Sequence, residues 1–306
     1  MLKKFALLLF LALATDAFAE MLPEPRTIKV NNRVFALLGP VDHANRHNQG
    51  YMINSTVIIG DTGVVLIESG GTDEVGQHIA AAVRRLTPKP VTHVVNTHHH
   101  GDHSLGNVAF AGAKFISSEK CRDMVLKTGE ESVRRMERDV RRRFPGTRPI
   151  AADITYKEGT KTSVILNGVN FIFWVPQGSH TVGDILVYLP DDRLLVAGDI
   201  LVNGVVPNMR DANIKNWIST LEELQRIDVN VFVPGHGPLM NKSDVKALHH
   251  SISTFYSGVK KGFLKGLREL EVRRFLDLSH WERLERSYVI GRNINRAYRE
   301  IGNDKF

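Results

Sequence analysis

Residues 91–103 read VTHVVNTHHHGDH, and the periodicity of the chain breaks after Asn96. The first part, Val91–Asn96, is rich in β-branched residues and predicts a strand. Side chains that can bind metals follow at positions 98, 100, 102 and 103. We therefore expect a loop at the carboxyl end of a strand, where a rigid scaffold presents functional groups.

The spacing within this loop predicts a metal site. His98 and His100 alternate and can point the same way toward one ion, while Asp102 and His103 can turn toward a second. His99, between them, is expected to point away. Thirteen histidines alone would show only a biased composition, but this clustering at a strand end favours metal binding.

Three later candidates each lie beside a glycine-containing turn that follows an apolar strand: His180 within Gly178–Asp184, Asp199 after Leu195–Gly198, and His236 within Val233–Pro238. Small neighbours allow the backbone to approach an ion closely. We expect His98, His100 and His180 to bind metal one, Asp102, His103 and His236 to bind metal two, and Asp199 to bridge the two ions.

Imidazole and carboxylate ligands without cysteine favour two zinc ions per chain, with iron or manganese as alternatives. A water between two such ions would have its pKa lowered from ~16 toward ~7, which supplies a hydroxide at neutral pH. Asp102 is the expected proton acceptor. Cys121 is the single cysteine, so the chain cannot form an intramolecular disulfide. One cysteine also excludes a zinc site made mainly of thiolate ligands.

Strands and helices alternate through the first 240 residues. Gly60–Gly63 predicts a hairpin turn between the strands Ser55–Ile59 and Val64–Glu68. The further expected strands are 34–38, 91–96, 114–117, 162–167, 170–175, 185–189, 194–197 and 231–233, and the expected helices are 73–86, 118–144 and 214–226. This order predicts a mixed α/β fold of two sheets with helices outside.

The two ends of the chain differ from its middle. Lys3 and Lys4 precede the apolar run Phe5–Ala14, and small residues at 17–19 follow, which is typical of a signal peptide at 1–19. The run is too short for stable membrane insertion, although an uncleaved anchor is the alternative. We thus expect a periplasmic or secreted protein with a catalytic domain at 20–240 and a helical extension at 241–306, where apolar residues recur at helical spacing.

The net charge of +7 raises the question of an acidic partner. Much of it lies in six arginines between 134 and 143, where Val133, Met136, Val140 and Phe144 recur at spacings of three and four. The arginines then cover the solvated face of a helix, and a nucleic-acid or membrane patch is the less favoured alternative. We expect a small-molecule substrate and no nucleic acid. The oligomeric state is left open.

The motif His98–His103 resembles the HxHxDH signature of the metallo-β-lactamase superfamily, and His180, Asp199 and His236 match its later metal-binding motifs over residues 28–240. The resemblance implies an αββα sandwich with the metals at one edge. Residues 96–110, 233–238 and 295–298 are also similar to exported zinc metallohydrolases associated with sulfur-oxidation and quinoprotein dehydrogenase systems.

Two positions depart from the family pattern. Asp199 stands where true β-lactamases usually have Cys or Ser, which resembles glyoxalase II and lactonase-like members. Glu68 stands where the family usually has Asp, so the orientation of one ligand is expected to change slightly. An insertion of the nuclease type is not evident, which disfavours RNA processing.

We therefore expect an exported dinuclear zinc hydrolase acting on an ester, thioester, lactone or amide bond. The alternatives are β-lactamase activity, native or promiscuous, an iron-dependent enzyme resembling persulfide dioxygenases, and a metal-binding accessory protein of a periplasmic redox system. Candidate substrate contacts are His47 and Tyr51 in the loop 41–51, and Asn203 and Asn208 after Asp199. Arg210 is a weaker candidate of the same kind, and Asp184 is expected either to orient a ligand or to cap a turn.

Overall fold

The structure is a computed structural model that describes residues 21–303. The predicted signal peptide lies outside the described residues and stays a prediction. No helix among residues 21–303 is long and apolar enough to cross a membrane.

Two β-sheets form the centre of the molecule. The first has seven strands in chain order: β1 (Arg26–Lys29), β2 (Val34–Leu38), β3 (Ser55–Ile59), β4 (Val64–Ile67), β5 (Val91–Val95), β6 (Lys114–Ser118) and β7 (Ile154–Tyr156). Its first three pairings are antiparallel, and the pairings from β4 to β7 are parallel.

The second sheet has five strands in the order β12-β11-β10-β9-β8: β8 (Lys161–Leu166), β9 (Val169–Trp174), β10 (Leu186–Leu189), β11 (Leu194–Val202) and β12 (Val231–His236). Only β11 and β12 pair in parallel; the other neighbours are antiparallel. Asn167 and Gly168, both with positive φ, form the two-residue turn between β8 and β9, as a tight hairpin requires.

The two sheets pack face to face because successive side chains on a strand point to opposite faces. In β4, Val65 and Ile67 point inward and pack with residues of the second sheet such as Val187 and Val196. Leu66 points outward, into a core formed with the flanking helix. Burial on both faces explains why these strands are continuous apolar runs.

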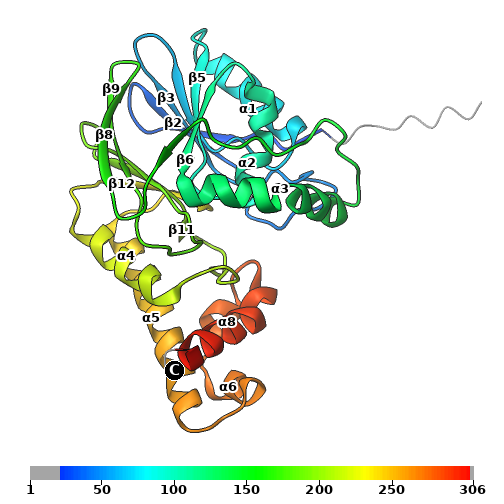
Figure 1. The fold of residues 1–306 in the computed structure, drawn as a ribbon, viewed down its shortest axis with the longest axis vertical. Coiled ribbons are helices and arrows are strands. Elements are labelled where there is room, and N and C mark those ends of the chain that lie inside the picture. The colour runs from blue at the N-terminus through cyan, green and yellow to red at the C-terminus, as the bar shows by residue number, and fades with distance from the viewer. Residues whose placement is uncertain (1–20, 304–306) are drawn as a thin grey trace, which may run out of the picture.

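Helices cover the outer faces of both sheets (Figure 1). The helices of the first part are α1 (Asp73–Leu86), α2 (Gly101–Ser104), the 3₁₀ helix η1 (Leu105–Phe110), α3 (Glu119–Val140) and α4 (Ile214–Arg226). In α1, the Thr72 hydroxyl accepts a hydrogen bond from the Val75 amide and so caps the helix. The predicted αββα sandwich is thereby confirmed.

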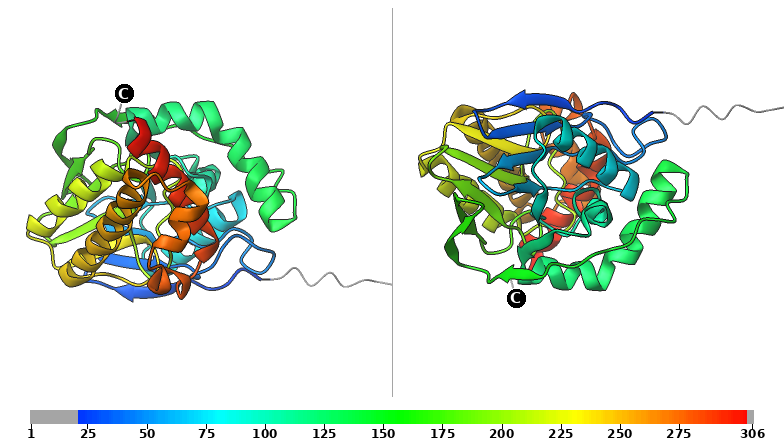
Figure 2. Two further views of the ribbon diagram at one scale, coloured as in Figure 1. Left: turned by 90° about the horizontal axis from the view of Figure 1, so that it is seen from below. Right: turned by 90° about the horizontal axis from the view of Figure 1, so that it is seen from above.

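The chain after residue 240 is helical, as expected. It consists of α5 (Lys242–Leu264), α6 (Glu269–Phe275), α7 (Ser279–Glu282), the 3₁₀ helix η2 (Ser287–Val289) and α8 (Ile290–Asn303). These helices extend from one end of the sandwich (Figure 1) and pack on α4 and the second sheet. Figure 2 shows the tail end-on, in front of or behind the sheets. Asn293 of α8 is fully buried and ties the tail to the loop after β11: its side-chain amide donates to the Pro207 carbonyl and accepts from the Met209 amide.

Several predicted boundaries were wrong. The strand expected at 194–197 runs through Val202, so Asp199 lies inside β11 rather than after it. Gly198 has a φ of +50°, and the pairing with β12 is irregular on both sides of it. This bulge changes the direction of the chain without ending the strand. The apolar pattern of the sequence gives no sign of such a bulge. The helix expected at 118–144 ends at Val140 because Arg141 takes a left-handed conformation. Strands β1 and β7 were not predicted.

Candidate metal centre

The loop that follows β5 is held from both sides by hydrogen bonds. The His103 carbonyl accepts bonds from the Ser69 amide and from the Asn96 side-chain amide. Asn107, fully buried, donates to the Asn96 side chain and accepts from the Ser69 hydroxyl. The short helix α2 turns within this frame, so the spacing 98, 100, 102, 103 projects its side chains to one edge of the sandwich.

The first group of metal-ligand side chains consists of His98, His100, His180 and Asp199. Nδ1 of His100 lies 3.0 Å from Nε2 of His98 and 3.2 Å from Nε2 of His180. Nε2 of His180 is 3.6 Å from a carboxylate oxygen of Asp199. One candidate ligand atom from each of the four residues therefore lies within 4.8 Å of the others.

The second group consists of Asp102, His103 and His236, again within 4.8 Å of one another. Nε2 of His236 lies 3.4 Å from Asp102 Oδ2 and 3.3 Å from Asp199 Oδ2. Nε2 of His103 lies 3.3 Å from Asp199 Oδ1. Asp199 thus reaches both groups, and the structure brings all seven predicted residues together in the division that the sequence suggests.

This donor set fits divalent metal ions. Buried atoms without a hydrogen-bond partner gather here, among them Nε2 of His103, Nε2 of His236 and Oδ1 of Asp199. Buried polar groups are nearly always paired, because leaving one unpaired costs about 1–3 kcal/mol. Converging imidazole and carboxylate lone pairs are satisfied together by a cation such as zinc.

The protonation states of the first group also suit metal binding. Burial lowers the pKa of His180 to about 3 and that of His98 well below its usual value. Both imidazoles are therefore neutral, as a ligand must be. Burial opposes the charge of Asp199, but His236 and His103 hold the pKa of this carboxyl well below its usual range.

The outward-facing nitrogens of three histidines have partners that orient the rings. Glu68 lies 3.2 Å from Nδ1 of His103, Asp211 lies 2.8 Å from Nε2 of His100, and Nδ1 of His236 donates to the Met52 carbonyl at 2.7 Å. Such partners fix the ring and raise its basicity. The sequence pointed to Glu68 only. A backbone carbonyl leaves no signal in a sequence, and Asp211 is one more acidic residue in a polar loop.

Asp184 holds the turn that carries His180. Its carboxylate accepts hydrogen bonds from the amides of Ser179 and Thr181 and from the Thr181 hydroxyl, which confirms the expected turn role. Burial raises the pKa of Asp184 to about 7. The His180 ring also packs edge-on against Trp217, whose indole donates to the Ile200 carbonyl.

Two glycines are needed for close approach at this edge. A Cβ at Gly198 would collide with the Thr97 side chain, and the left-handed φ of this residue further disfavours any other residue. A Cβ at Gly235 would collide with the Asp199 carboxylate. The glycines therefore let β11 and β12 bring Asp199 and His236 beside the histidine loop.

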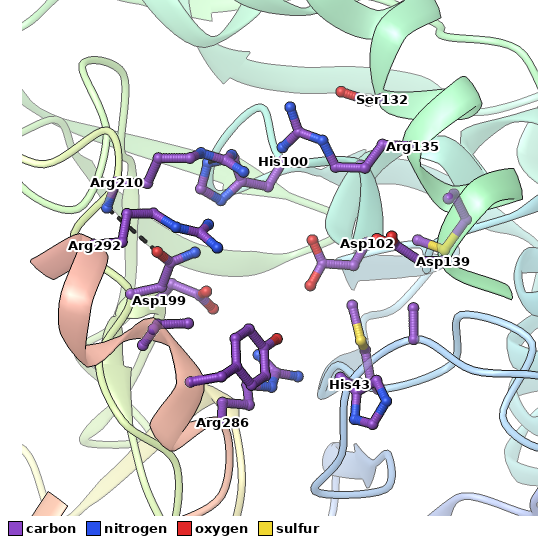
Figure 3. A pocket seen from close by; sticks show the side chains of 17 residues that line it. His43, His100, Asp102, Ser132, Arg135, Asp139, Asp199, Arg210, Arg286 and Arg292 are labelled. Atoms are coloured by element: carbon purple, nitrogen blue, oxygen red, sulfur yellow. Dashed lines mark hydrogen bonds between the residues drawn. The ribbon is translucent and has the colours of Figure 1, made fainter.

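A cavity of about 610 Å³ opens at the metal-ligand groups (Figure 3). His100, Asp102 and Asp199 form its floor, and its walls come from the loop 41–52, from α3, from the loop after β11 and from the tail. Asp102 is the more open of the two carboxylates, with 15% of its side chain exposed against 8% for Asp199.

The four predicted substrate contacts differ in their positions. Asn208 lines the cavity. Tyr51 does not, and its prediction was wrong: it is fully buried in the core outside the first sheet, where it packs against His78. His47 is exposed outside the cavity lining, although its neighbour His43 lines it. Asn203 pairs instead with the Pro238 carbonyl.

The metallo-β-lactamase superfamily model matches residues 49–236, and the chain belongs to this superfamily. The fold and the ligand positions described above agree with that assignment, and the enzyme class that it supports is the metal-dependent hydrolases. The resemblance seen in the sequence is thus confirmed at the level of the superfamily.

Its curated relatives are distant and varied. The linear primary-alkylsulfatase of a Pseudomonas strain is 24% identical over 221 residues, which are 60% of this chain and 41% of that protein. The 2,4-dinitroanisole O-demethylase subunit alpha of a Nocardioides strain is 23% identical over 64% of this chain and 56% of that protein. The chain thus spans about half the length of these two relatives. The type 2 metallo-β-lactamase of Elizabethkingia meningoseptica is 24% identical over 81% of this chain and 92% of that protein.

Solved structures show the same fold. The metallo-β-lactamase from Pontibacter korlensis matches with a TM-score of 0.59 and 22% identity over 75% of this chain and 99% of that chain. The metallo-β-lactamase FIM-1 from Pseudomonas aeruginosa, in a mono-zinc form, matches with a TM-score of 0.61 and 17% identity over 76% of this chain and 96% of that chain.

Proposed function

We propose that this chain is a dinuclear zinc hydrolase that cleaves an ester, thioester, lactone or amide bond in a small molecule. The observation that carries the proposal is the position of Asp199 between the two groups of metal-ligand side chains. Its Oδ2 lies 3.6 Å from His180 of the first group and 3.3 Å from His236 of the second, and its Oδ1 lies 3.3 Å from His103 of the second. A shared carboxylate at this point favours two ions at one cavity floor over a single ion.

Two bound metal ions would acidify a water molecule and polarise the bond to be cleaved. The chain's own residues then have separate tasks. The three oriented histidines keep their lone pairs fixed, so little reorganisation is needed during the reaction. Of the two carboxylates in the metal-ligand groups, Asp102 is the more exposed, and it is suited to hold a proton at Oδ2.

The alternatives have less support. A carboxylate at position 199 favours hydrolysis of esters, thioesters or lactones over β-lactamase activity as the main function. The complete set of ligand-type side chains also disfavours an enzyme with a single iron, and a cavity floored by that set disfavours a purely accessory role. Export to the periplasm or beyond is part of the proposal and rests on the predicted signal peptide.

The test is a substrate panel on the purified, zinc-loaded chain, with Asp102→Asn as the variant. We expect turnover of at least one ester, thioester or lactone. We also expect a loss of about 10²-fold or more in kcat, because Asp102→Asn removes both a proton acceptor and a carboxylate of the second metal-ligand group. Asp139→Asn is the matched control, since this carboxylate also lines the cavity but lies outside the metal-ligand groups. Full zinc loading without turnover of any panel member would contradict the proposal.

A further inference from the structure

Four arginines line the cavity above the metal-ligand groups, and they come from three distant parts of the chain. Arg135 belongs to α3, Arg210 follows β11, and Arg286 and Arg292 belong to the tail. Figure 3 shows Arg135 reaching into the opening from one side and Arg292 from the other, with Arg210 beside His100. The helical tail thus supplies half of the arginines of the site.

Two of the four are already engaged. The Arg210 guanidinium donates to Asp211 at 2.8 Å and lies 3.1 Å from Nε2 of His100. Arg286 donates to the Asp42 carbonyl at 2.6 and 3.0 Å, with Nη2 lying 3.3 Å from Nδ1 of His236. These contacts fix the two guanidinium groups at the rim of the metal-ligand groups.

Arg135 and Arg292 differ, since among residues 21–303 neither makes a hydrogen bond or an ion pair. Other arginines of α3 and the segment after it do have partners: Arg134 and Arg138 bind Glu131, and Arg143 binds Glu137. Arg135 is therefore not simply part of the solvated face that the sequence suggested. It points from that face into the cavity.

The lining of the cavity has more positive than negative side chains once the carboxylates of the metal-ligand groups are set aside. Its carboxylates are Asp102, Asp199 and Asp139. The first two belong to the metal-ligand groups, so Asp139 is the one carboxylate of the lining left to balance the four arginines. Asp211 lies outside the lining and pairs with Arg210. Burial and the nearby Arg210 lower the pKa of Arg135. Like charges held together at a partly enclosed site are stabilised when an anion binds between them.

We propose that these arginines form an anion-binding collar, defined as Arg135, Arg210, Arg286 and Arg292, and that the substrate carries a carboxylate, sulfate or phosphate group held by it. This inference rests on the proposed hydrolase function and narrows its substrate class. Planar guanidinium groups match such oxyanions with paired hydrogen bonds. Arg135 and Arg292, which have no hydrogen-bond or ion-pair partner within residues 21–303, supply the free donors.

The test compares two esters with the same scissile bond. Mono-4-nitrophenyl glutarate carries a carboxylate, and 4-nitrophenyl pentanoate is its neutral counterpart. We expect the double variant Arg135→Gln/Arg292→Gln to raise KM for the anionic ester by about tenfold or more, with the neutral ester unchanged. The control is the double variant Arg122→Gln/Arg299→Gln, which removes the same charge from α3 and α8 at exposed positions outside the cavity. It should leave the KM of both esters unchanged.

Equilibrium binding gives a readout that does not depend on turnover. Calorimetric titration with glutarate, and separately with sodium sulfate, should show tighter binding to the wild type than to the cavity double variant, and weaker binding as salt rises. The anion that binds more tightly, glutarate or sulfate, identifies the kind of oxyanion that the collar prefers. If no member of the substrate panel is cleaved but this dependence on the two arginines persists, the hydrolase proposal fails and the collar stands. Equal binding to wild type and double variant, with both folded by circular dichroism, would overturn the collar.

Discussion

Asp211 offers a sharp test of how the metal-ligand side chains are oriented. Its carboxylate lies 2.8 Å from Nε2 of His100, on the side of the ring opposite the nitrogen that faces His98 and His180. Replacing Asp211 with Asn keeps the shape but removes the charge. It also leaves the Arg210 cation, 3.1 Å from the same His100 nitrogen, without its counter-charge.

The expected effects on metal binding and on stability differ in size. Partners of this kind are worth about 10- to 100-fold in metal affinity, which is about 1.4–2.7 kcal/mol. The carboxylate is 35% exposed and its ion pair with Arg210 is partly solvated, so the cost to the free energy of unfolding is at most about 1 kcal/mol. Asp211→Asn should therefore bind zinc much more weakly while remaining folded.

The assay is competition for zinc against a chromophoric chelator, with urea unfolding of the metal-free chain in parallel. Asp192→Asn is the matched control, because Asp192 is 6% exposed and pairs with Arg33 and Asn31 away from the metal-ligand groups. The control should lose stability and keep its zinc affinity. Zinc affinity of Asp211→Asn equal to that of the wild type would refute the role assigned to this carboxylate.

Further predictions concern the frame of the site and its dependence on pH. Gly198→Ala should lower the free energy of unfolding by about 1–3 kcal/mol, because its left-handed φ disfavours alanine, and urea titration measures this. Asn293→Ala leaves the Pro207 carbonyl and the Met209 amide unpaired and should cost about 1–3 kcal/mol for each group, again by urea titration; an unchanged midpoint would contradict the tie between tail and loop. Although burial opposes its charge, contacts with His100 and Arg210 hold the pKa of Asp211 below its ordinary 3.8, so its contribution is present above that pH and lost as the pH falls. The stability difference between wild type and Asp211→Asn should therefore vanish in acid, as parallel unfolding curves would show. Removing metal with a chelator should lower the thermal midpoint, because ligands of the folded state stabilise it.

The ligand set could be predicted from the sequence because few residue types bind metals and their spacing is recognisable. A run such as His98–His103 at a strand end is rare, and the later three residues lie beside glycines that close approach requires. The strands were also readable, since alternation and apolar runs follow from which face of a sheet is buried. What the pattern missed was geometry that depends on a bulge, as at Gly198, or on strands with exposed faces, as at β1.

The substrate side of the site was predicted less well because it is assembled from distant segments. Arg135 was part of an exposed arginine stripe in the sequence, and Arg292 was one cation among many in the tail. Only the fold brings α3 and α8 to opposite sides of one cavity. Tyr51 shows the converse error: a polar loop suggested a substrate contact, but the ring is buried with the apolar core.

Metal content tests the central claim most directly. Elemental analysis of the purified, zinc-equilibrated chain should give about two zinc equivalents, and His236→Ala should reduce this to about one while the fold, followed by circular dichroism, is retained. That result would assign the second ion to the group of Asp102, His103 and His236. A folded wild-type chain that binds one equivalent or less would contradict the account.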